Sequence, residues 1–360
     1  MKPESAPGKI AVKTETGSQD FTALKECLAN LLTDSFPSGL SLAVVGPEGA
    51  CFCAYGGSAC RTGTHRPITT STSYDLASLT KVVCSVTLAL VFVERQMISL
   101  EDPVQRWLGG FPRSDTTLLH LITHTSGLSA HRPFFEHLRG RPAIEAAVLD
   151  EAARSAPTSE VLYSDLNFML LGWVLEACAG SPLDELFARE VAFPLGMRST
   201  GFRPPPGTES AATELDGDQR LVPGLVWGEV HDGNCWALGG VAGHAGLFGP
   251  LEDLTTFVRH LLTPDGRVLG PAALRAIAER RAGQPPEIRG LGWRLQPQGW
   301  GDWPEDTLWH TGFTGTSLLV SRSIGLGVVL LTNAIHPHRH LEQQAEMRAV
   351  IHRRVSEAFA

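Results

Sequence analysis

The chain has 360 residues, of which 43% are hydrophobic and 19% charged, and its formal net charge is −8. This is the composition of a globular protein with a sizeable core, and it excludes an intrinsically disordered chain. The length suits one large two-lobed unit or two small domains, and an acidic chain without a basic stripe argues against a nucleic-acid partner.

The N-terminal region predicts a tail, a helix and a hairpin. Residues 1–19 are polar and without periodicity, so we expect a loose tail, and they hold no signal-peptide core. Apolar residues at helical spacing predict a helix over 21–32. Two β-like runs, 40–45 and 50–55, flank a turn at 46–49 and predict a hairpin.

A long, mostly buried helix is predicted over 78–95, and its apolar stretch is too short to span a bilayer. The following part, 103–194, is rich in helical patterns, and 203–235 reads as a long loop rich in Pro, Gly and Asp. An amphipathic helix is predicted over 251–262. The last part predicts three strands and a closing helix, over 307–311, 316–321, 325–332 and 341–359.

Both ends of the chain therefore carry strands and the middle does not. We expect an α+β fold in which both ends form one antiparallel sheet flanked by the terminal helices, with a mostly helical second lobe. The expected parts are a tail (1–19), a discontinuous α/β lobe (20–95 and 236–360) and the helical lobe with its long loop (96–235). An active site is expected between the lobes.

Cysteine and histidine usage bears on location and metals. Seven cysteines without regular spacing, and no export signal, predict reduced thiols in a cytoplasm. His336, His338 and His340 alternate around a proline, where a solvated loop is the better interpretation than a metal site. We therefore predict no metal.

The strongest functional signal is Ser78 followed three residues later by Lys81. Residues three apart share one face of a helix, so the pair places a hydroxyl beside an amine. A serine needs a base to take its proton before it can act as a nucleophile, and a lysine in a dry site could do this. The alternative is a helix-capping serine beside a solvated lysine. The apolar helix that follows favours the catalytic interpretation.

Two further segments carry candidate chemistry. Tyr163 precedes the clearest helical pattern of the middle region and could act as general base if nearby cations stabilise its phenolate. Its neighbours Ser164 and Asp165 could instead cap that helix. Between two predicted strands lies the segment 310–315, whose backbone N–H groups could complete an oxyanion hole with that of Ser78. A hairpin turn with two glycines is the simpler interpretation of that segment.

Taken in order, these motifs resemble the three signatures of the penicillin-recognising serine hydrolases: Ser78 with Lys81, Tyr163 with Asp165, and His310-Thr311-Gly312. The stretches 118–128 and 328–333 support the resemblance, which covers about residues 20–358. It is closest to the class C β-lactamase-like branch, which includes β-lactamases, D-alanyl-D-alanine peptidases and esterases. The resemblance implies a β-lactamase-like fold that needs no metal or organic cofactor.

Two further stretches, 230–234 and 238–248, resemble a subgroup associated with bacterial cell-wall recycling, including N-acetylmuramyl-L-alanine amidases. They contain His231 and His244, which we expect to contact substrate in the cleft. The simpler interpretation is structural, since a lone histidine in a Gly-rich loop is more often a hydrogen-bond partner.

Three positions depart from the family pattern. His310 stands where the third motif usually has lysine, and a partly neutral imidazole attracts a substrate carboxylate less strongly. Asp165 stands where asparagine is usual, and a carboxylate near Lys81 favours the protonated amine, which makes Tyr163 the better base candidate. Phe313 is bulky where a small polar residue often supports β-lactam recognition. Together these changes argue against an efficient β-lactamase.

The expected function is a serine hydrolase that cleaves an ester or amide of a small molecule or short peptide, related by the resemblance to cell-wall peptides. An acyl-enzyme forms on Ser78, Lys81 and Tyr163 move its proton, and the N–H groups of Ser78 and Phe313 hold the oxyanion. The expected substrate contacts are Asp165, His310, Thr311, Gly312, Phe313, His244 and His231. The alternatives are a non-catalytic ligand-binding or scaffold protein, and a weak β-lactamase or D-alanyl-D-alanine carboxypeptidase.

Overall fold

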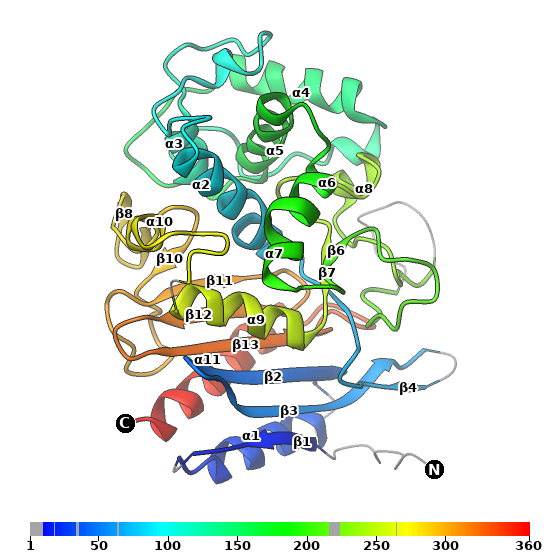
Figure 1. The fold of residues 1–360 in the computed structure, drawn as a ribbon. Helices are drawn as coiled ribbons and strands as arrows, with labels where there is room; N and C mark the ends of the chain where they lie inside the picture. The colour runs from blue at the N-terminus through cyan, green and yellow to red at the C-terminus, as the bar shows by residue number, and fades with distance from the viewer. Residues whose placement is uncertain (1–9, 18, 34–35, 63–64, 216–223, 264) are drawn as a thin grey trace.

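The computed structural model describes residues 10–360 except 18, 34–35, 63–64, 216–223 and 264. A large antiparallel sheet forms one layer, and a mostly helical lobe lies against one of its faces (Figure 1). Both ends of the chain contribute to the sheet. Its strand order is β1 (Ile10–Glu15), β3 (Gly49–Cys60), β2 (Gly39–Gly46), β13 (Leu326–Thr332), β12 (Ser317–Ser321), β11 (Leu308–Thr311), β10 (Arg294–Leu295), β9 (Glu287–Arg289) and β8 (Ala282–Gln284), with β4 (Arg66–Pro67) paired to β3.

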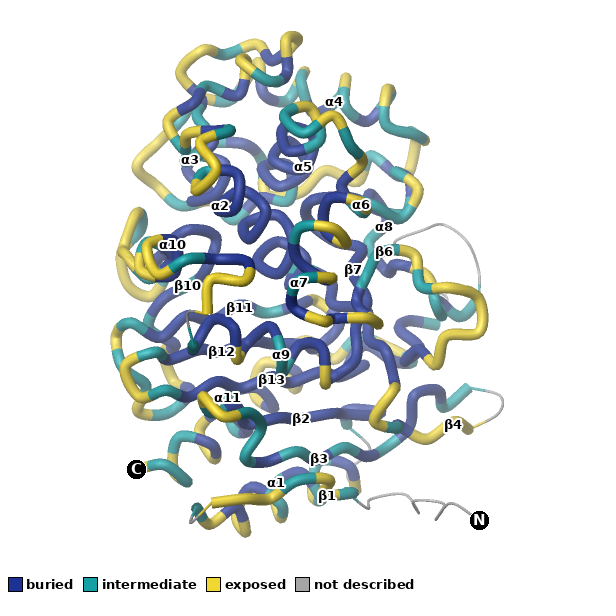
Figure 2. The backbone as a smooth tube through the Cα atoms, viewed as in Figure 1, coloured by how far each residue is buried: buried dark blue, intermediate teal, exposed yellow. Residues whose placement is uncertain are grey.

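The central strands are apolar on both faces because both faces are covered. In β2, Leu42 and Val44 pack into a core with the terminal helices α1 (Thr22–Thr33) and α11 (Leu341–Ala358). The alternate residues Ala43 and Val45 point into the larger core shared with the helical lobe. Helix α9 (Leu251–Leu262) lies on that second face. Figure 2 shows the resulting continuous buried layer through the sheet and into the helices.

The helical lobe is built around two buried segments. The first is η1 (Lys81–Val86), a π-helical turn that continues into α2 (Thr87–Glu94), and the second is α5 (Asp165–Ala179). The other helices of the structure are η2 (Val104–Arg106), α3 (Leu118–Ile122), η3 (Phe134–Glu136), α4 (Arg141–Ala153), α6 (Leu183–Phe187), η4 (Ala188–Ala192), α7 (Phe193–Leu195), α8 (Gly233–Ala237) and α10 (Pro271–Ala276).

A small second sheet joins the lobes beside the large one. Its order is β5 (Tyr74–Asp75), β7 (Leu247–Gly249) and β6 (Gly201–Phe202). Strand β5 leads directly to Ser78, and Leu76 N–H extends the pairing by donating to Leu247 O at 2.9 Å. The segment that carries the serine is therefore fixed by a strand on one side and a buried helix on the other.

The predicted α+β, β-lactamase-like sheet with its terminal helices is confirmed, but two local predictions are wrong and several short strands were not predicted. The tail does not extend to residue 19, because β1 pairs with β3 from Ile10 opposite Gly56 to Glu15 opposite Phe52. Strand β1 lies at the sheet edge and carries polar residues, so its sequence shows no clear apolar alternation. Strands β4 to β10 were missed because runs of two or three residues show no alternation, and β6 lies in the middle part that was expected to carry no strand. Ser78 lies in the turn before the helix and not in its first turn.

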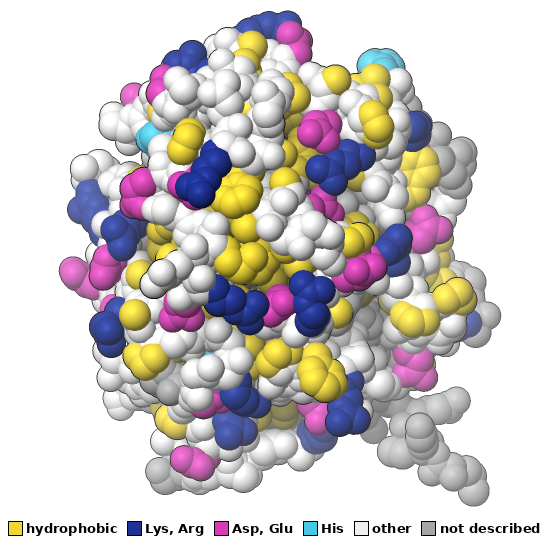
Figure 3. Space-filling view, turned by 45° about the horizontal axis from the view of Figure 1, so that its top comes forward, with side chains coloured by type: hydrophobic (Ala, Val, Ile, Leu, Met, Phe, Trp, Pro, Cys, Tyr) yellow, Lys and Arg dark blue, Asp and Glu magenta, His cyan; other side chains and the backbone are white. Residues whose placement is uncertain are grey.

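Three observations bear on partners and location. On the face drawn in Figure 3, basic and acidic side chains are interspersed and form no single-sign patch. Within the described part of the chain, no single helix is long and apolar enough to cross a membrane, and the bent pair 165–179 with 183–195 passes that test only when its halves are combined. Each of the seven cysteines carries a free thiol. The cytoplasmic location stays a prediction.

Candidate active site

Ser78 sits on a sharp turn at the junction of the two lobes. Ala77, just before it, has a φ of 47°, a left-handed conformation that is unusual for a residue with a β-carbon. The turn is held because Ala77 N–H donates to Asp75 Oδ1 at 2.8 Å. Ser78 is half-buried, so its hydroxyl reaches the space between the lobes. A strained turn that exposes one serine is the arrangement expected of a nucleophile.

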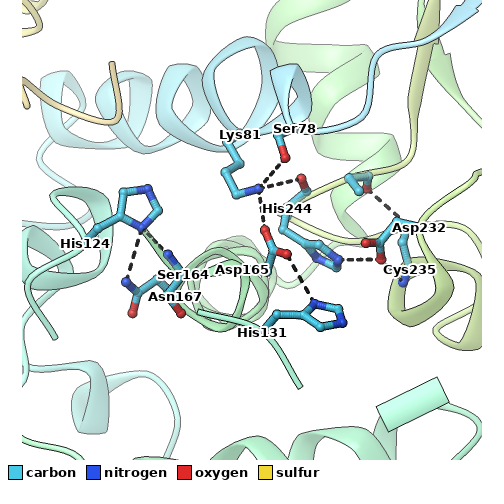
Figure 4. Close-up of polar contacts among 12 residues, drawn as sticks. Ser78, Lys81, His124, His131, Ser164, Asp165, Asn167, Asp232, Cys235 and His244 are labelled. Carbon is cyan, nitrogen blue, oxygen red and sulfur yellow. Dashed lines mark hydrogen bonds and ion pairs between the residues drawn. The ribbon is translucent and has the colours of Figure 1, made fainter. Parts of the chain in front are cut away.

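Lys81 connects this serine to the helical lobe. Its Nζ donates to Ser78 Oγ at 2.9 Å, to Asp165 Oδ1 at 2.7 Å and to the backbone oxygen of His244 at 3.1 Å (Figure 4). The side chain of Lys81 is fully buried. His131 stands on the far side of Asp165, with Nδ1 at 3.5 Å from Oδ2. The three acceptors satisfy the three N–H bonds of an ammonium group.

The charges of this pair are set by competition between burial and attraction. Burial alone would lower the pKa of Lys81, but the Asp165 carboxylate and Tyr163 outweigh it, and the pKa of Lys81 is raised. Burial alone would raise the pKa of Asp165, but Lys81 and His131 hold it far below its usual range. Lys81 is therefore an ammonium at neutral pH, as the sequence predicted for a lysine beside this carboxylate.

Tyr163 lies against two cations. Lys81 Nζ is 4.9 Å and Arg289 Cζ is 5.2 Å from the centroid of its ring. The ring of His124 packs on it at a centroid distance of 4.6 Å, and His124 Nδ1 accepts a hydrogen bond from Ser164 N–H at 3.0 Å. Burial, helped by nearby cations, holds the pKa of His124 well below its usual value, so this support is neutral.

The third motif requires its glycine. A β-carbon at Gly312 would lie 2.1 Å from Thr316 Oγ1 and 2.6 Å from Leu76 O, so only glycine lets this turn approach the Ser78 segment. Thr314 Oγ1 donates to Asp75 O at 2.7 Å and joins the same two segments. The turn after β11 is thereby fixed against the turn that carries the nucleophile.

Two backbone N–H groups at this junction are available to a ligand. Those of Ser78 and Phe313 donate to no other residue that the structure describes. The peptide of Phe313 is fixed because its carbonyl accepts from Gln344 Nε2 at 2.8 Å. Both residues line the same two cavities. The pair fits the predicted oxyanion hole.

One cavity, of about 350 Å³, lies on the cationic side of Ser78. His310, the residue in place of the usual lysine, is 3% exposed. Burial, together with the charges of Arg289, Lys81 and Arg294, holds the pKa of His310 well below its usual value, so it carries no charge at neutral pH. Three guanidinium groups line the same cavity: Arg289, Arg294 and Arg348.

A second cavity, of about 310 Å³, lies on the other side of Ser78 and is lined by acidic and histidine side chains. It contains Asp165, Asp232, His131 and His231. The ring of His231 stacks on exposed Phe313 at 5.5 Å, so these two form one wall of the cavity. A further cavity, of about 670 Å³, contains no catalytic candidate and borders this wall through residues 228–230.

The structure brings together nearly all the predicted site residues. Ser78, Lys81, Tyr163, Asp165, Phe313 and the third motif meet at one junction, and His231 lines the acidic cavity.

His244 departs from its prediction as a substrate contact. Its side chain is 1% exposed and is turned to Asp232, with Nε2 at 2.8 Å from Oδ1. Gly243, just before it, packs so closely on α5 that a β-carbon would lie 2.1 Å from Phe168 O. His244 is therefore held inside the lobe and reaches the site through its backbone oxygen alone.

Three residues near the serine were not singled out from the sequence. His124 belongs to a stretch that supports the family resemblance, and its role as a ring support for Tyr163 could have been suspected there. His131 and Arg289 lie in segments without a recognisable motif. Only the folded chain brings Arg289, on β9, against the tyrosine.

Comparison with known proteins agrees with this geometry. The family model described as Beta-lactamase matches residues 25–352. A protein of Salmonella typhimurium with the provisional name D-alanyl-D-alanine carboxypeptidase is 28% identical over a 317-residue alignment, and the match covers 74% of this chain and 71% of the relative.

Two solved structures share the fold at lower identity. A class C beta-lactamase from Rhodobacter sphaeroides superposes with a TM-score of 0.74 at 21% identity, over 94% of this chain and 99% of the other. EstCE1, described as a hydrolase with promiscuous acyltransferase activity, gives 0.70 at 22% identity over 93% and 98%.

Proposed function

The chain belongs to the beta-lactamase family and is a serine hydrolase, and from this premise we propose that it cleaves short peptides beside a C-terminal carboxylate. Ser78 forms the acyl-enzyme in this proposal, and the C-terminal residue is the leaving group. Peptides derived from the bacterial cell wall are the substrate class that fits best, because curated relatives carry the name of D-alanyl-D-alanine carboxypeptidases.

The first half-reaction transfers an acyl group to the serine. Ser78 Oγ attacks the scissile carbonyl, and its proton passes to the phenolate oxygen of Tyr163. The carbonyl oxygen becomes an oxyanion held by the N–H groups of Ser78 and Phe313. The C–N bond then breaks as Tyr163 returns the proton to the leaving amine. Lys81 stays an ammonium and stabilises negative charge on both hydroxyl oxygens.

The second half-reaction reverses these roles with water. A water molecule takes the place of the departed amine, and Tyr163 removes its proton as it attacks the ester carbonyl. The second oxyanion forms in the same hole and collapses. Ser78 Oγ leaves the carbonyl carbon and recovers the proton from Tyr163, and the free acid is released. Atoms and charges balance without a metal or an organic cofactor.

The observation that carries the proposal is the cationic cavity beside the nucleophile. It is lined by Ser78 and Tyr163 together with three arginines. Arg294 is the accessible one, since its side chain is 31% exposed. A carboxylate held there by a guanidinium would place the adjacent peptide bond next to Ser78. A neutral ester would use the same catalytic groups without this attraction.

An ester substrate is the second candidate. The exposed ring of Phe313, 39% exposed at the rim of both cavities, offers apolar contact to an alkyl or aryl group. The similarity to a hydrolase with acyltransferase activity is in the fold. This candidate predicts better turnover of neutral esters than of peptides with a free carboxylate.

The test compares wild type with Ser78→Ala on four substrates. These are an N-acylated D-alanyl-D-alanine peptide, the same peptide as its C-terminal amide, a p-nitrophenyl ester and a chromogenic cephalosporin. We expect hydrolysis of the free-carboxylate peptide to exceed that of the amide, and the variant to lose it. Equal rates on acid and amide would refute the role of the cationic cavity. Unchanged turnover by the variant would refute Ser78 as the nucleophile.

A further inference from the structure

We propose that Arg289 is a positioning residue that acts through Tyr163, supplying from strand β9 the positive charge that the third motif lacks in this chain. The inference rests on the acyl-transfer reaction proposed above and adds a residue to it. Neither the family comparison nor the motifs assign a role to this arginine.

The third motif cannot supply the charge itself. His310 is 3% exposed, and its Nδ1 lies 3.0 Å from the backbone oxygen of Thr311. Its Nε2 has no hydrogen-bond partner among the described residues. A protonated imidazole would need a second acceptor in this position, and none is within reach. The ring is therefore neutral and 6.1 Å from the ring of Tyr163.

Arg289 holds a charge where burial makes charge costly. Its side chain is 1% exposed, and a single ion pair joins Nη2 to Glu287 Oε1 at 2.5 Å. Nε and Nη1 have no partner among the described residues. Its guanidinium carbon lies 5.2 Å from the centroid of the Tyr163 ring, and both residues line the cationic cavity with Ser78. A purely structural arginine would be expected to use more of its five donors.

The charges around Tyr163 do not cancel on this side. Lys81 is matched by Asp165 at 2.7 Å, so that pair contributes little net charge. Glu287 is shared between Arg289 and Arg294, which leaves one positive charge in excess. Of these two arginines, Arg289 is the buried one in contact with the tyrosine ring, and Arg294 stacks on Trp309 at 4.7 Å instead.

Because a buried charge is weakly screened, it acts strongly on a ring whose centroid lies 5.2 Å away. At an effective dielectric constant of about 20, a unit charge at about that distance changes an equilibrium by roughly 100-fold. Arg289 would stabilise negative charge on Tyr163 by up to this factor. Removing the guanidinium should therefore slow the proton transfers that Tyr163 carries out.

The experiment measures kcat and KM at pH 7 on a neutral p-nitrophenyl ester, which has no carboxylate for an arginine to bind. The variants are Arg289→Met, Arg289→Lys and Glu287→Gln, with Arg281→Met as the control that removes a guanidinium paired with Glu279 outside the cationic cavity. Thermal unfolding of each variant confirms that it is folded.

For Arg289→Met we expect kcat/KM at pH 7 to fall about 10- to 100-fold, through kcat more than through KM. Arg289→Lys should recover most of the loss. Glu287→Gln should raise kcat, and this partly exposed site keeps the test valid if Arg289→Met does not fold. Arg281→Met should leave both constants nearly unchanged.

Two outcomes would overturn the inference. One is an unchanged kcat on the neutral ester in folded Arg289→Met and in Glu287→Gln. The other is a loss that appears only as a raised KM for peptides with a free carboxylate, which would make Arg289 a substrate ligand. Failure of the proposed function is distinct from both, because wild type would then neither turn over the ester nor react at Ser78 with a serine-directed phosphonate.

Discussion

Replacing Asp165 with asparagine tests whether Lys81 is held as an ammonium by one buried carboxylate. The two groups lie 2.7 Å apart, with side chains 0% and 19% exposed. Asparagine keeps the shape and a hydrogen-bond acceptor but removes the charge. Lys81 would retain Ser78 Oγ at 2.9 Å and His244 O at 3.1 Å as acceptors. What it loses is the compensation of its charge.

The size of the stability loss follows from the burial of this ion pair. Removing one partner of a buried pair costs about 3–5 kcal/mol, because the remaining charge has no counter-ion. Since two neutral acceptors remain and Asp165 is not wholly enclosed, we expect the lower value, about 3 kcal/mol of unfolding free energy at pH 7. An exposed pair costs less than about 1 kcal/mol. Asp150, paired with Arg154 and 63% exposed, gives the matched control Asp150→Asn.

The stability that Asp165→Asn loses relative to wild type should also depend on pH. The pKa of Asp165 is lowered in the folded chain, so its contribution is present above its unfolded value near 3.9 and is lost as pH falls below it. The pKa of Lys81 is raised, so its contribution is present at neutral pH and is lost as pH rises through the folded value. The difference between wild type and Asp165→Asn should therefore be largest near pH 5–9 and smaller by roughly 1 kcal/mol at pH 3.

Urea unfolding at pH 7 and pH 3 measures these differences, with the slopes compared to check that the unfolding reaction is unchanged. Asp165→Asn should lower the midpoint markedly while Asp150→Asn leaves it nearly unchanged. If both variants cost less than about 1 kcal/mol at pH 7, Lys81 is not held by a buried pair. The assignment of the base to Tyr163 would then lose its main support.

Three further substitutions test other parts of the site and the core. Gly312→Ala would place its β-carbon 2.1 Å from Thr316 Oγ1, so we expect about 2 kcal/mol lower stability and at least a tenfold fall in ester hydrolysis. The control Gly109→Ala, whose β-carbon would have no atom within 4 Å, should change neither stability nor hydrolysis. His310→Lys restores the usual motif residue but places its positive charge beside buried Arg289. We therefore expect about 2 kcal/mol or more of destabilisation and no faster hydrolysis of a chromogenic cephalosporin. A stable variant with faster hydrolysis would contradict the assignment of a buried positive charge to Arg289. Burial lowers the pKa of His352 to about 3, so this residue is protonated first in the unfolded chain as pH falls. Wild type should therefore lose up to about 1.4 kcal/mol of unfolding free energy per pH unit below about 6.5. In urea titrations His352→Gln should lose less stability per pH unit, and an identical slope would refute this reasoning.

The sequence predicted the parts of the fold whose signal is periodic. Strands β2, β11, β12 and β13 and helix α9 were placed within a residue, because apolar residues repeat along them at regular intervals, whereas β3 runs five residues beyond its predicted end at 55. Strand β1 was missed because an edge strand needs only one apolar face, and half of its side chains are exposed. Strands β9 and β10 are held by ladder hydrogen bonds and by Glu287 with its arginines, which leave no pattern in so short a run.

For the site, the sequence identified groups that act through their side chains in ordered motifs. It could not identify groups that act through position. His244 was expected to contact substrate because it lies in a stretch that resembles a family subgroup, yet its backbone carbonyl accepts a hydrogen bond from Lys81 instead. Gly312 was expected to contact substrate, and its missing β-carbon also leaves space for the backbone of Leu76. Such close approaches become visible only when distant segments are brought together.

The neutral His310 shows why one motif residue does not fix the electrostatics of a pocket. From the sequence, histidine in place of lysine meant a weaker positive charge. In the folded chain Arg289, from a neighbouring part of the same sheet, carries a buried charge against Tyr163, and that charge is itself one cause of the low pKa of His310. A lysine at 310 would therefore repel Arg289, while removal of Arg289 would leave the tyrosine without its excess positive charge. The two positions are coupled, so His310→Lys should be tolerated better in the Arg289→Met background than in wild type. Thermal unfolding of the double variant measures this coupling, and strictly additive losses would refute it.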